Sequence, residues 1–82
     1  MKPNYSNQRV VLELFYRYRS QWLNPAMVAR LVGWPVVRSY VCCMRLCEKG
    51  WVQRTDAGRM LLYRISISGV RRLAWLREVT AA

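Results

Sequence analysis

Histidine is missing from this 82-residue chain, acidic residues number only four, and glycine and proline occur only four and three times. Without histidine, acid–base catalysis near neutral pH would need a strongly shifted glutamate or lysine, and a cysteine nucleophile would lack an imidazole to activate it. The carboxylates are scattered along the sequence, at Glu13, Glu48, Asp56 and Glu78. We therefore expect a protein that is not an enzyme and that uses no cofactor.

Long apolar runs are lacking as well. None approaches the roughly 18 residues that a membrane span needs, and the N-terminal segment MKPNYSNQR has no apolar region typical of a signal peptide. The composition is that of a globular chain, 54% hydrophobic, with no internal repeat or low-complexity segment. We expect one domain over residues 1–82, in the cytoplasm and without a membrane partner.

Positive charge is what the sequence has in excess. Fourteen lysines and arginines against four acidic residues give a formal net charge of +10, and twelve of the fourteen are arginine. A planar guanidinium binds phosphate or guanine at two points, so such a surplus suits nucleic acid. A codon bias toward arginine would also raise the charge, but self-repulsion of this size favours an acidic partner.

The first helix is predicted to begin after a cap at Ser6 or Asn7 and to end near Arg19. Apolar residues recur there with the spacing of one helical face, at Val11, Leu14, Phe15, Tyr18 and Trp22.

Two further helices are predicted on either side of a tight turn. Asn24 caps the second helix, with Pro25 at its first position, and Gly33 ends it. Trp34-Pro35 opens the third helix by the same device, and that helix runs to residue 48 or 49 before Gly50 stops it in a left-handed conformation. Two helices joined in this way form a helix-turn-helix unit.

A β-hairpin and a last helix complete the chain. The segments WVQR at 51–54 and RMLLYRISI at 59–67 are strand-like and flank the four-residue loop TDAG. In the second arm Leu61, Tyr63 and Ile65 alternate with Met60, Leu62 and Arg64, and one of these two faces should pack on the helices. Ser66 then caps the last helix, whose apolar residues are Val70, Leu73, Ala74, Trp75, Leu76 and Val79.

The segments LCEKGWVQR and YRISISGVRRL, separated by a short loop, resemble the winged helix-turn-helix of MarR-type regulators over Asn24 to Leu73. In size and in EKGWVQR the chain is also similar to small fimbrial regulators of the PapI and FaeA kind. The resemblance implies an α+β fold, a small winged helix-turn-helix of three helices, a hairpin wing and a C-terminal helix. Winged helices also serve in replication initiators, phage repressors and protein-interaction modules, so the fold alone does not define the function.

By this resemblance the third helix enters the major groove and the wing touches the backbone or minor groove. Arg38, Arg45 and Lys49 recur at spacings of seven and four residues and form a basic stripe. We expect Arg38 and Arg45 at base edges, helped by Tyr40. Phosphate contacts are expected from Lys49 and Arg64, and from Arg54 and Arg59, which bracket the predicted wing turn.

The rest of the third helix is unusually apolar for a DNA-reading helix, at Val36, Val37, Tyr40, Val41 and Met44. Three explanations stay open: contacts with thymine methyl groups, a protein or dimer partner on this face through Val37 and Val41, or deeper burial of the helix. Dimerisation is expected instead at the last helix, with DNA half-sites about one helical turn apart. The residues expected at that interface are Leu73, Trp75, Leu76 and Val79.

All three cysteines lie within VCCMRLC, at Cys42, Cys43 and Cys47. Burial as small hydrophobic side chains is the first interpretation, because free cysteines are often buried. Thiol or metal sensing is the alternative, with Cys47 as the reactive thiol. Zinc sites use four ligands at looped spacing, and the Cys-x-Cys of ArsR-type sensors differs from this spacing, so we expect no metal.

These observations predict a sequence-specific double-stranded DNA-binding protein, a small transcriptional regulator such as a repressor. The alternative is a winged-helix adaptor of phage or plasmid origin that binds a protein co-regulator through its apolar third helix.

Overall fold

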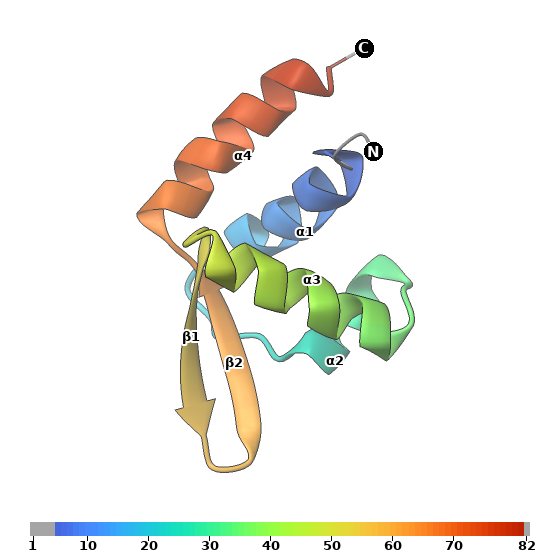
Figure 1. Ribbon diagram of the computed structural model, residues 1–82, viewed down its shortest axis with the longest axis vertical. Coiled ribbons are helices and arrows are strands. Elements are labelled where there is room, and N and C mark those ends of the chain that lie inside the picture. Colours follow the sequence, from blue (N-terminus) through green and yellow to red (C-terminus); the bar gives the residue numbers. More distant parts are fainter. Residues whose placement is uncertain (1–4, 82) are drawn as a thin grey trace.

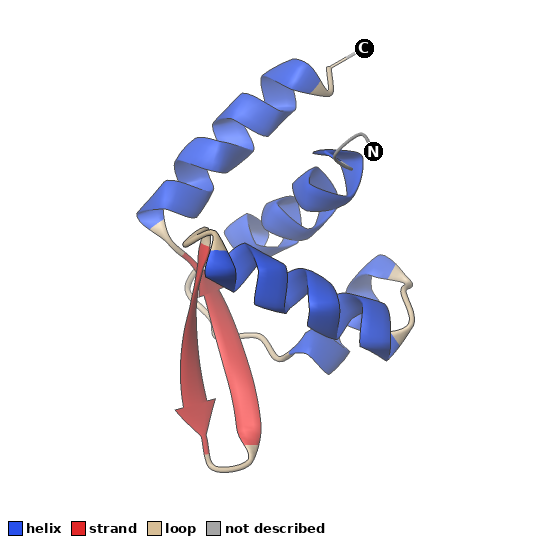
Figure 2. Cartoon of the chain, in the orientation of Figure 1, coloured by secondary structure: helices blue, strands red, loops and turns tan. Residues whose placement is uncertain are grey.

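The structure is a computed structural model that describes residues 5–81, in which three helices precede an antiparallel hairpin and a fourth helix follows it (Figures 1 and 2). This order confirms the α+β class and the predicted sequence of elements. The elements are α1 (Tyr5–Arg17), α2 (Pro25–Val32), α3 (Val36–Glu48), β1 (Val52–Ala57), β2 (Met60–Ile65) and α4 (Ile67–Val79).

The core forms where the four helices and the base of the hairpin meet. Tyr63 is its largest fully buried side chain. The other buried members come from every element: Val11, Leu12, Phe15, Leu23, Val28, Cys43, Leu46, Val52, Ile65, Leu73 and Leu76. The alternation in the second arm predicted one buried face, and the structure shows that it is the face of Tyr63 and Ile65, with Leu61 packed against the core. Removing these side chains from water is the main favourable contribution to folding.

α1 and α4 lie side by side, away from the tip of the hairpin (Figure 1). Three polar contacts join the two helices or the residue that follows α4. The guanidinium groups of Arg9, Arg72 and Arg77 donate to the side chains of Thr80 (2.9 Å), Gln8 (3.1 Å) and Glu13 (3.2 Å from Nε), respectively. These hydrogen bonds therefore join the N-terminal and C-terminal helices of the described chain.

The hairpin is longer and its turn tighter than the sequence suggested. β1 and β2 pair from Val52↔Ile65 to Ala57↔Met60, which leaves only Gly58 and Arg59 in the turn. The predicted four-residue loop TDAG is wrong, because three of its residues pair within the sheet and Gly58 alone has the left-handed φ, 64°, that a two-residue turn demands. β2 ends at Ile65 rather than at residue 67.

Two helix starts also differ from expectation. Ser6 and Asn7 lie inside α1 rather than capping it, and α1 ends at Arg17, two residues before the predicted end. Pro35 takes the N-cap position of α3 instead of its first helical position, and it makes no side-chain cap hydrogen bond because proline offers no acceptor there. The N-cap at Ser66 is confirmed by the Gly69 N–H, which donates to the Ser66 hydroxyl at 3.0 Å.

Candidate nucleic-acid interface

Capping and one buried hydrogen bond fix the two helices of the helix-turn-helix unit. The Asn24 side chain accepts from the Met27 N–H at 2.8 Å at the start of α2, as predicted. Gly33 ends α2 with φ at 76°, which confirms the predicted left-handed stop. The buried Ser39 hydroxyl of α3 donates to the Pro25 carbonyl oxygen at 2.7 Å. This bond sets the position of α3 across α2.

α3 presents one face to the core and an apolar face to solvent. The core side carries Ser39, Cys43 and Leu46. The opposite side, which we call the apolar crest, consists of Val36, Val37, Tyr40, Val41 and Met44, all of them exposed. Val37 is the most exposed of the five, at 75%. Deeper burial of this helix is therefore excluded as the explanation of its apolar character.

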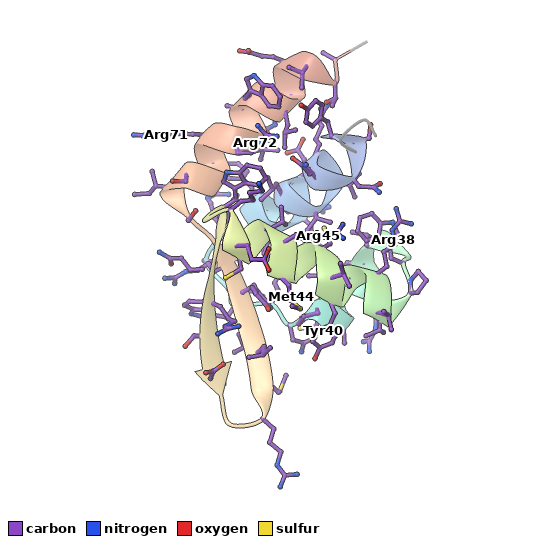
Figure 3. The ribbon with its side chains drawn as sticks, in the orientation of Figure 1. Arg38, Tyr40, Met44, Arg45, Arg71 and Arg72 are labelled. Atoms are coloured by element: carbon purple, nitrogen blue, oxygen red, sulfur yellow. The ribbon has the colours of Figure 1, made fainter. Side chains whose placement is uncertain are left out.

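Beside the crest runs a basic edge formed by Arg38, Arg45 and Lys49. Arg38 and Arg45 point toward α1, whereas Tyr40 and Met44 lie on the side of the hairpin (Figure 3). The sequence groups Arg38, Arg45 and Tyr40 as joint base contacts, but the structure places Tyr40 on the crest, on the other side of α3 from the two arginines (Figure 3). Within residues 5–81, none of the three cations of the basic edge forms an ion pair.

A groove of about 610 Å³ opens between the basic edge and the beginning of α1. Its apolar walls come from Val41, Cys42 and Leu46, and Trp34 and Trp51 line it from either side of α3 in the sequence. The polar lining consists of Asn7, Gln8, Arg38, Arg45, Glu48 and Lys49. The sequence did not reveal this groove, because the approach of α1 to the basic edge is a tertiary contact.

The three predicted arginines of the wing occupy different places on the hairpin. Arg59 lies in the turn, at the tip. Arg54 lies opposite Tyr63 in the middle of β1 and lines a smaller cavity next to α3, so it does not bracket the turn. Arg64, opposite Gln53, stacks over the ring of Trp22 with its guanidinium carbon 4.3 Å from the ring centroid.

The dimer surface predicted on the last helix is only partly available. Leu73 and Leu76 are buried in the chain's own core, where α4 packs on α1, and this corrects the expectation that they face a partner. Trp75 and Val79 remain exposed, although the Trp75 ring meets that of Tyr5 edge to face at 5.1 Å between centroids. Apolar periodicity alone did not separate the inner from the outer side of this helix.

The three cysteines are free thiols in different surroundings. Cys43 is buried, and burial raises the pKa of its thiol to about 12. Cys42 is half-buried, and burial raises its pKa despite the nearby charges of Arg38 and Arg45. Cys47 is also half-buried. Over the described part of the chain, no three histidine, cysteine or acidic residues gather closely enough to hold a metal ion.

The ion pairs among the described residues all involve Glu13 of α1, whereas Glu48 at the end of α3 and Asp56 of β1 form none. Glu13 pairs with Arg77 and, at 3.6 Å, with Arg9, and the hydrogen bond from Arg77 holds the pKa of this carboxyl below its usual range. These are the only ion pairs among residues 5–81. The cations of α3 and of the hairpin are therefore left without acidic partners inside the described chain.

A cluster of aromatic rings around Arg72 is a feature that the sequence did not indicate. The Arg72 guanidinium carbon lies 4.1 Å from the ring centroid of Trp75, 4.4 Å from that of Trp51 and 5.5 Å from that of Tyr5. Its buried Nε has no hydrogen-bond partner within the described residues. Only the tertiary packing of α1, α4 and residue 51 brings these rings together.

Helix-turn-helix, hairpin and closing helix together define a winged helix-turn-helix domain, and the chain has this fold. A mutant of the E. coli protein MarR complexed with operator DNA matches it with a TM-score of 0.77 and 18% sequence identity, over 92% of this chain and 54% of the other. A mutant of MepR from S. aureus bound to an oligodeoxyribonucleotide matches with a TM-score of 0.79 and 15% identity, over 88% of this chain and 54% of the other.

The chain spans about half the length of these matched structures. A further structure of MepR, a transcription regulator of the S. aureus multidrug efflux pump MepA, also matches, with a TM-score of 0.75 and 18% identity over 88% of this chain and 54% of the other. No family model matches the sequence, and neither does any curated protein. Within residues 5–81, no helix is long and apolar enough to cross a membrane.

Proposed function

We propose that this chain is a small transcriptional regulator of the cytoplasm that binds double-stranded DNA. α3 would lie in the major groove and the hairpin would follow the backbone. The observation that carries the proposal is the shared fold with two structures solved on DNA, combined with cations on α3 and on the hairpin that have no acidic partner within the described chain. The matched structures give no support to the alternative of a protein-binding adaptor.

The unpaired cations are the natural phosphate contacts. Arg59 at the tip of the wing and Arg54 in β1 would hold the backbone, with Arg64 and Lys49 beside them. Arginine and lysine bound to phosphate release condensed counterions, which makes the affinity for DNA strongly dependent on salt. Each of these contacts would fix the position of the domain on the duplex without reading its sequence.

The apolar crest would meet the bases. Val37, Val41 and Met44 would pack against thymine methyl groups in the major groove, and Tyr40 would approach the bases from the hairpin side. Arg38 and Arg45, on the other side of the crest, would reach base edges or phosphates from the basic edge. Sequence specificity would thus come from apolar contacts in the middle of α3 and from arginines on one side.

Dimerisation would place two such helices on successive turns of DNA. We assign the contact to the exposed part of α4, at Trp75 and Val79, because Leu73 and Leu76 are occupied in the core. Two copies related by a two-fold axis would read a palindromic site with half-sites about one helical turn apart. A dimer on such a site is suited to act as a repressor.

Fluorescence anisotropy with labelled duplex fragments over a range of salt concentrations tests the proposal. If one chain neutralises about five phosphates, log affinity should fall with log salt at a slope of about 4 to 5. Arg59→Ala should lower this slope by about one. Arg71→Ala, the same charge change on the outward side of α4, should leave the slope unchanged (Figure 3). Absence of binding at low salt, or binding that ignores salt, would contradict the proposal.

A further inference from the structure

The groove beside α3 has more positive charge than its own residues neutralise. Arg38, Arg45 and Lys49 line it, against the one carboxylate of Glu48. None of the three cations forms an ion pair within residues 5–81. Two positive charges are thus left over, and a doubly charged anion would balance them.

The cations are spaced along a single side of a helix. Arg45 lies one turn from Lys49 and two turns from Arg38, which corresponds to about 6 Å and about 10 Å of axial rise. A phosphate bound at Arg45 would therefore lie within reach of a second cation on either side. The guanidinium of Arg38 stacks on the Trp34 ring, 4.1 Å from its centroid, and this contact uses its face while its N–H groups stay available in the plane.

The apolar walls of the groove indicate that the same ligand also has a flat apolar part. Between the cations lie Val41, Cys42 and Leu46, and Trp34 and Trp51 contribute aromatic surface. A phosphate alone would leave these apolar walls exposed to water, whereas an aromatic base would cover them and stack on a tryptophan ring. The volume of about 610 Å³ is within the range of small-molecule sites.

We propose that this groove binds a nucleotide unit, with its phosphate at Arg45 and its base against an aromatic wall. The amide side chain of Gln8, across the groove on α1, is placed to meet polar atoms of the base or sugar. The unit can be a free mononucleotide or the end of a single-stranded nucleic acid, since both present the same base and phosphate. Recognition by both parts distinguishes this site from the sequence-independent phosphate contacts of the wing.

One consequence rests on the proposed function. If α3 lies in the major groove of DNA, Arg38 and Arg45 serve both the duplex and the nucleotide, and the two ligands compete. A nucleotide in the groove would then weaken duplex binding and act as an effector. The site itself does not depend on this competition.

Calorimetric titration at low salt tests the site with three probes: adenosine monophosphate, adenosine and inorganic phosphate. We expect the monophosphate to bind at least tenfold more tightly than either of the other two, because each of them lacks half of the recognised unit. Arg45→Ala should weaken monophosphate binding at least tenfold, and Arg71→Ala, which removes the same charge from the outer side of α4, should not change it. Equal affinity for nucleoside and nucleotide, or an unchanged affinity in Arg45→Ala, would overturn the assignment.

The indole N–H resonances of the four tryptophans locate the ligand. Trp34 and Trp51 line the groove and should shift on titration, whereas Trp22, stacked under Arg64 at the hairpin, should not. A shift confined to Trp22 would place the nucleotide elsewhere and refute the proposal.

A short single-stranded oligonucleotide separates the two sources of the nucleotide. If the oligonucleotide binds and Arg45→Ala abolishes this binding, the site is supported. If, in addition, the mononucleotide does not bind, the site is assigned to the ends of nucleic acids. Failure of both, with duplex binding intact, overturns this inference and leaves the proposed function standing. Nucleotide binding without any duplex binding keeps the groove site and overturns the DNA-binding proposal.

Discussion

The backbone of Gly69 in α4 lies directly against the carbonyl group of Trp51, at the junction between α3 and the hairpin. A Cβ at position 69 would overlap the Trp51 carbonyl oxygen and would lie 2.8 Å from Cγ1 of Ile65. The same carbonyl oxygen accepts the N–H of Ser66 at 3.1 Å, and the Ser66 hydroxyl reaches the Gly50 carbonyl oxygen at 2.6 Å. Hydrogen bonds and close packing therefore hold the beginning of α4 against Gly50 and Trp51, which directly follow α3.

Gly69→Ala should therefore destabilise the fold, although alanine normally favours a helix over glycine by about 1 kcal/mol. Because backbone must move to admit the methyl group, we expect the free energy of unfolding to fall by about 2 to 4 kcal/mol. Urea denaturation measures the change. Ser68→Ala, at the exposed neighbouring position, is the control and should stay within about 0.5 kcal/mol of the parent. An unchanged midpoint for Gly69→Ala would show that the contact is absent.

Ser39→Ala should loosen the helix-turn-helix unit. The substitution removes the buried hydroxyl that donates to the Pro25 carbonyl oxygen and joins α3 to the start of α2. We expect a loss of about 1 kcal/mol in the free energy of unfolding, the usual net contribution of such a bond. Thermal melting checks this, with the exposed Ser6→Ala as the matched control. Equal losses in the two variants would count against a role for the buried bond.

Stability should fall at alkaline pH because of Cys43. Its thiol ionises near pH 9 when unfolded but has a pKa of about 12 in the fold. Between these values the unfolded state binds fewer protons, so the free energy of unfolding decreases as pH rises, by at most about 1.4 kcal/mol per pH unit for this one group. Denaturation midpoints between pH 8 and 11 should show the decrease. Cys43→Ala should make the decrease shallower, whatever its effect at neutral pH, and the remaining decrease comes from Cys42 and Tyr63, whose pKa values burial also raises. An equally steep decrease in this variant would contradict the assignment.

Val79→Asp should convert a dimer into a monomer, since it places a charge in the proposed apolar contact on α4. Light scattering coupled to size-exclusion chromatography measures the mass directly. Met60→Asp, at an exposed apolar position on the hairpin, is the control and should leave the mass unchanged. A parent protein that is monomeric at high concentration and stays so on DNA would refute the dimer.

Local signals in the sequence were sufficient to predict most of the fold. The caps at Asn24 and Ser66 and the glycine stops at Gly33 and Gly50 depend on a few neighbouring residues, so they could be placed correctly. The hairpin turn could not be placed, because the pairing of β1 with β2 selected the two-residue turn over the polar segment TDAG.

The candidate site could be predicted only in part. The helical spacing placed Arg38 and Arg45 together on one side of α3, but it contained no information about what lies across from them. The start of α1 forms the opposite wall, at a distance in sequence that no periodicity covers. For the same reason, the sequence predicts Leu76 at a partner surface, whereas it is buried in the core formed where α4 packs on α1.

The hydrogen bonds that join α1 to α4 and to Thr80 connect residues that are far apart in the sequence. Gln8 and Arg72 are 64 residues apart, as are Glu13 and Arg77, and Arg9 and Thr80 are 71 apart. Nearly the whole chain must be closed into a loop before these contacts form, and that closure carries an entropy cost. α2, α3 and the hairpin are held by contacts much closer in sequence and can form first. On the ribosome, α2 and β2 can contact α1 early, but the part of α1 that α4 covers stays exposed until α4 has emerged.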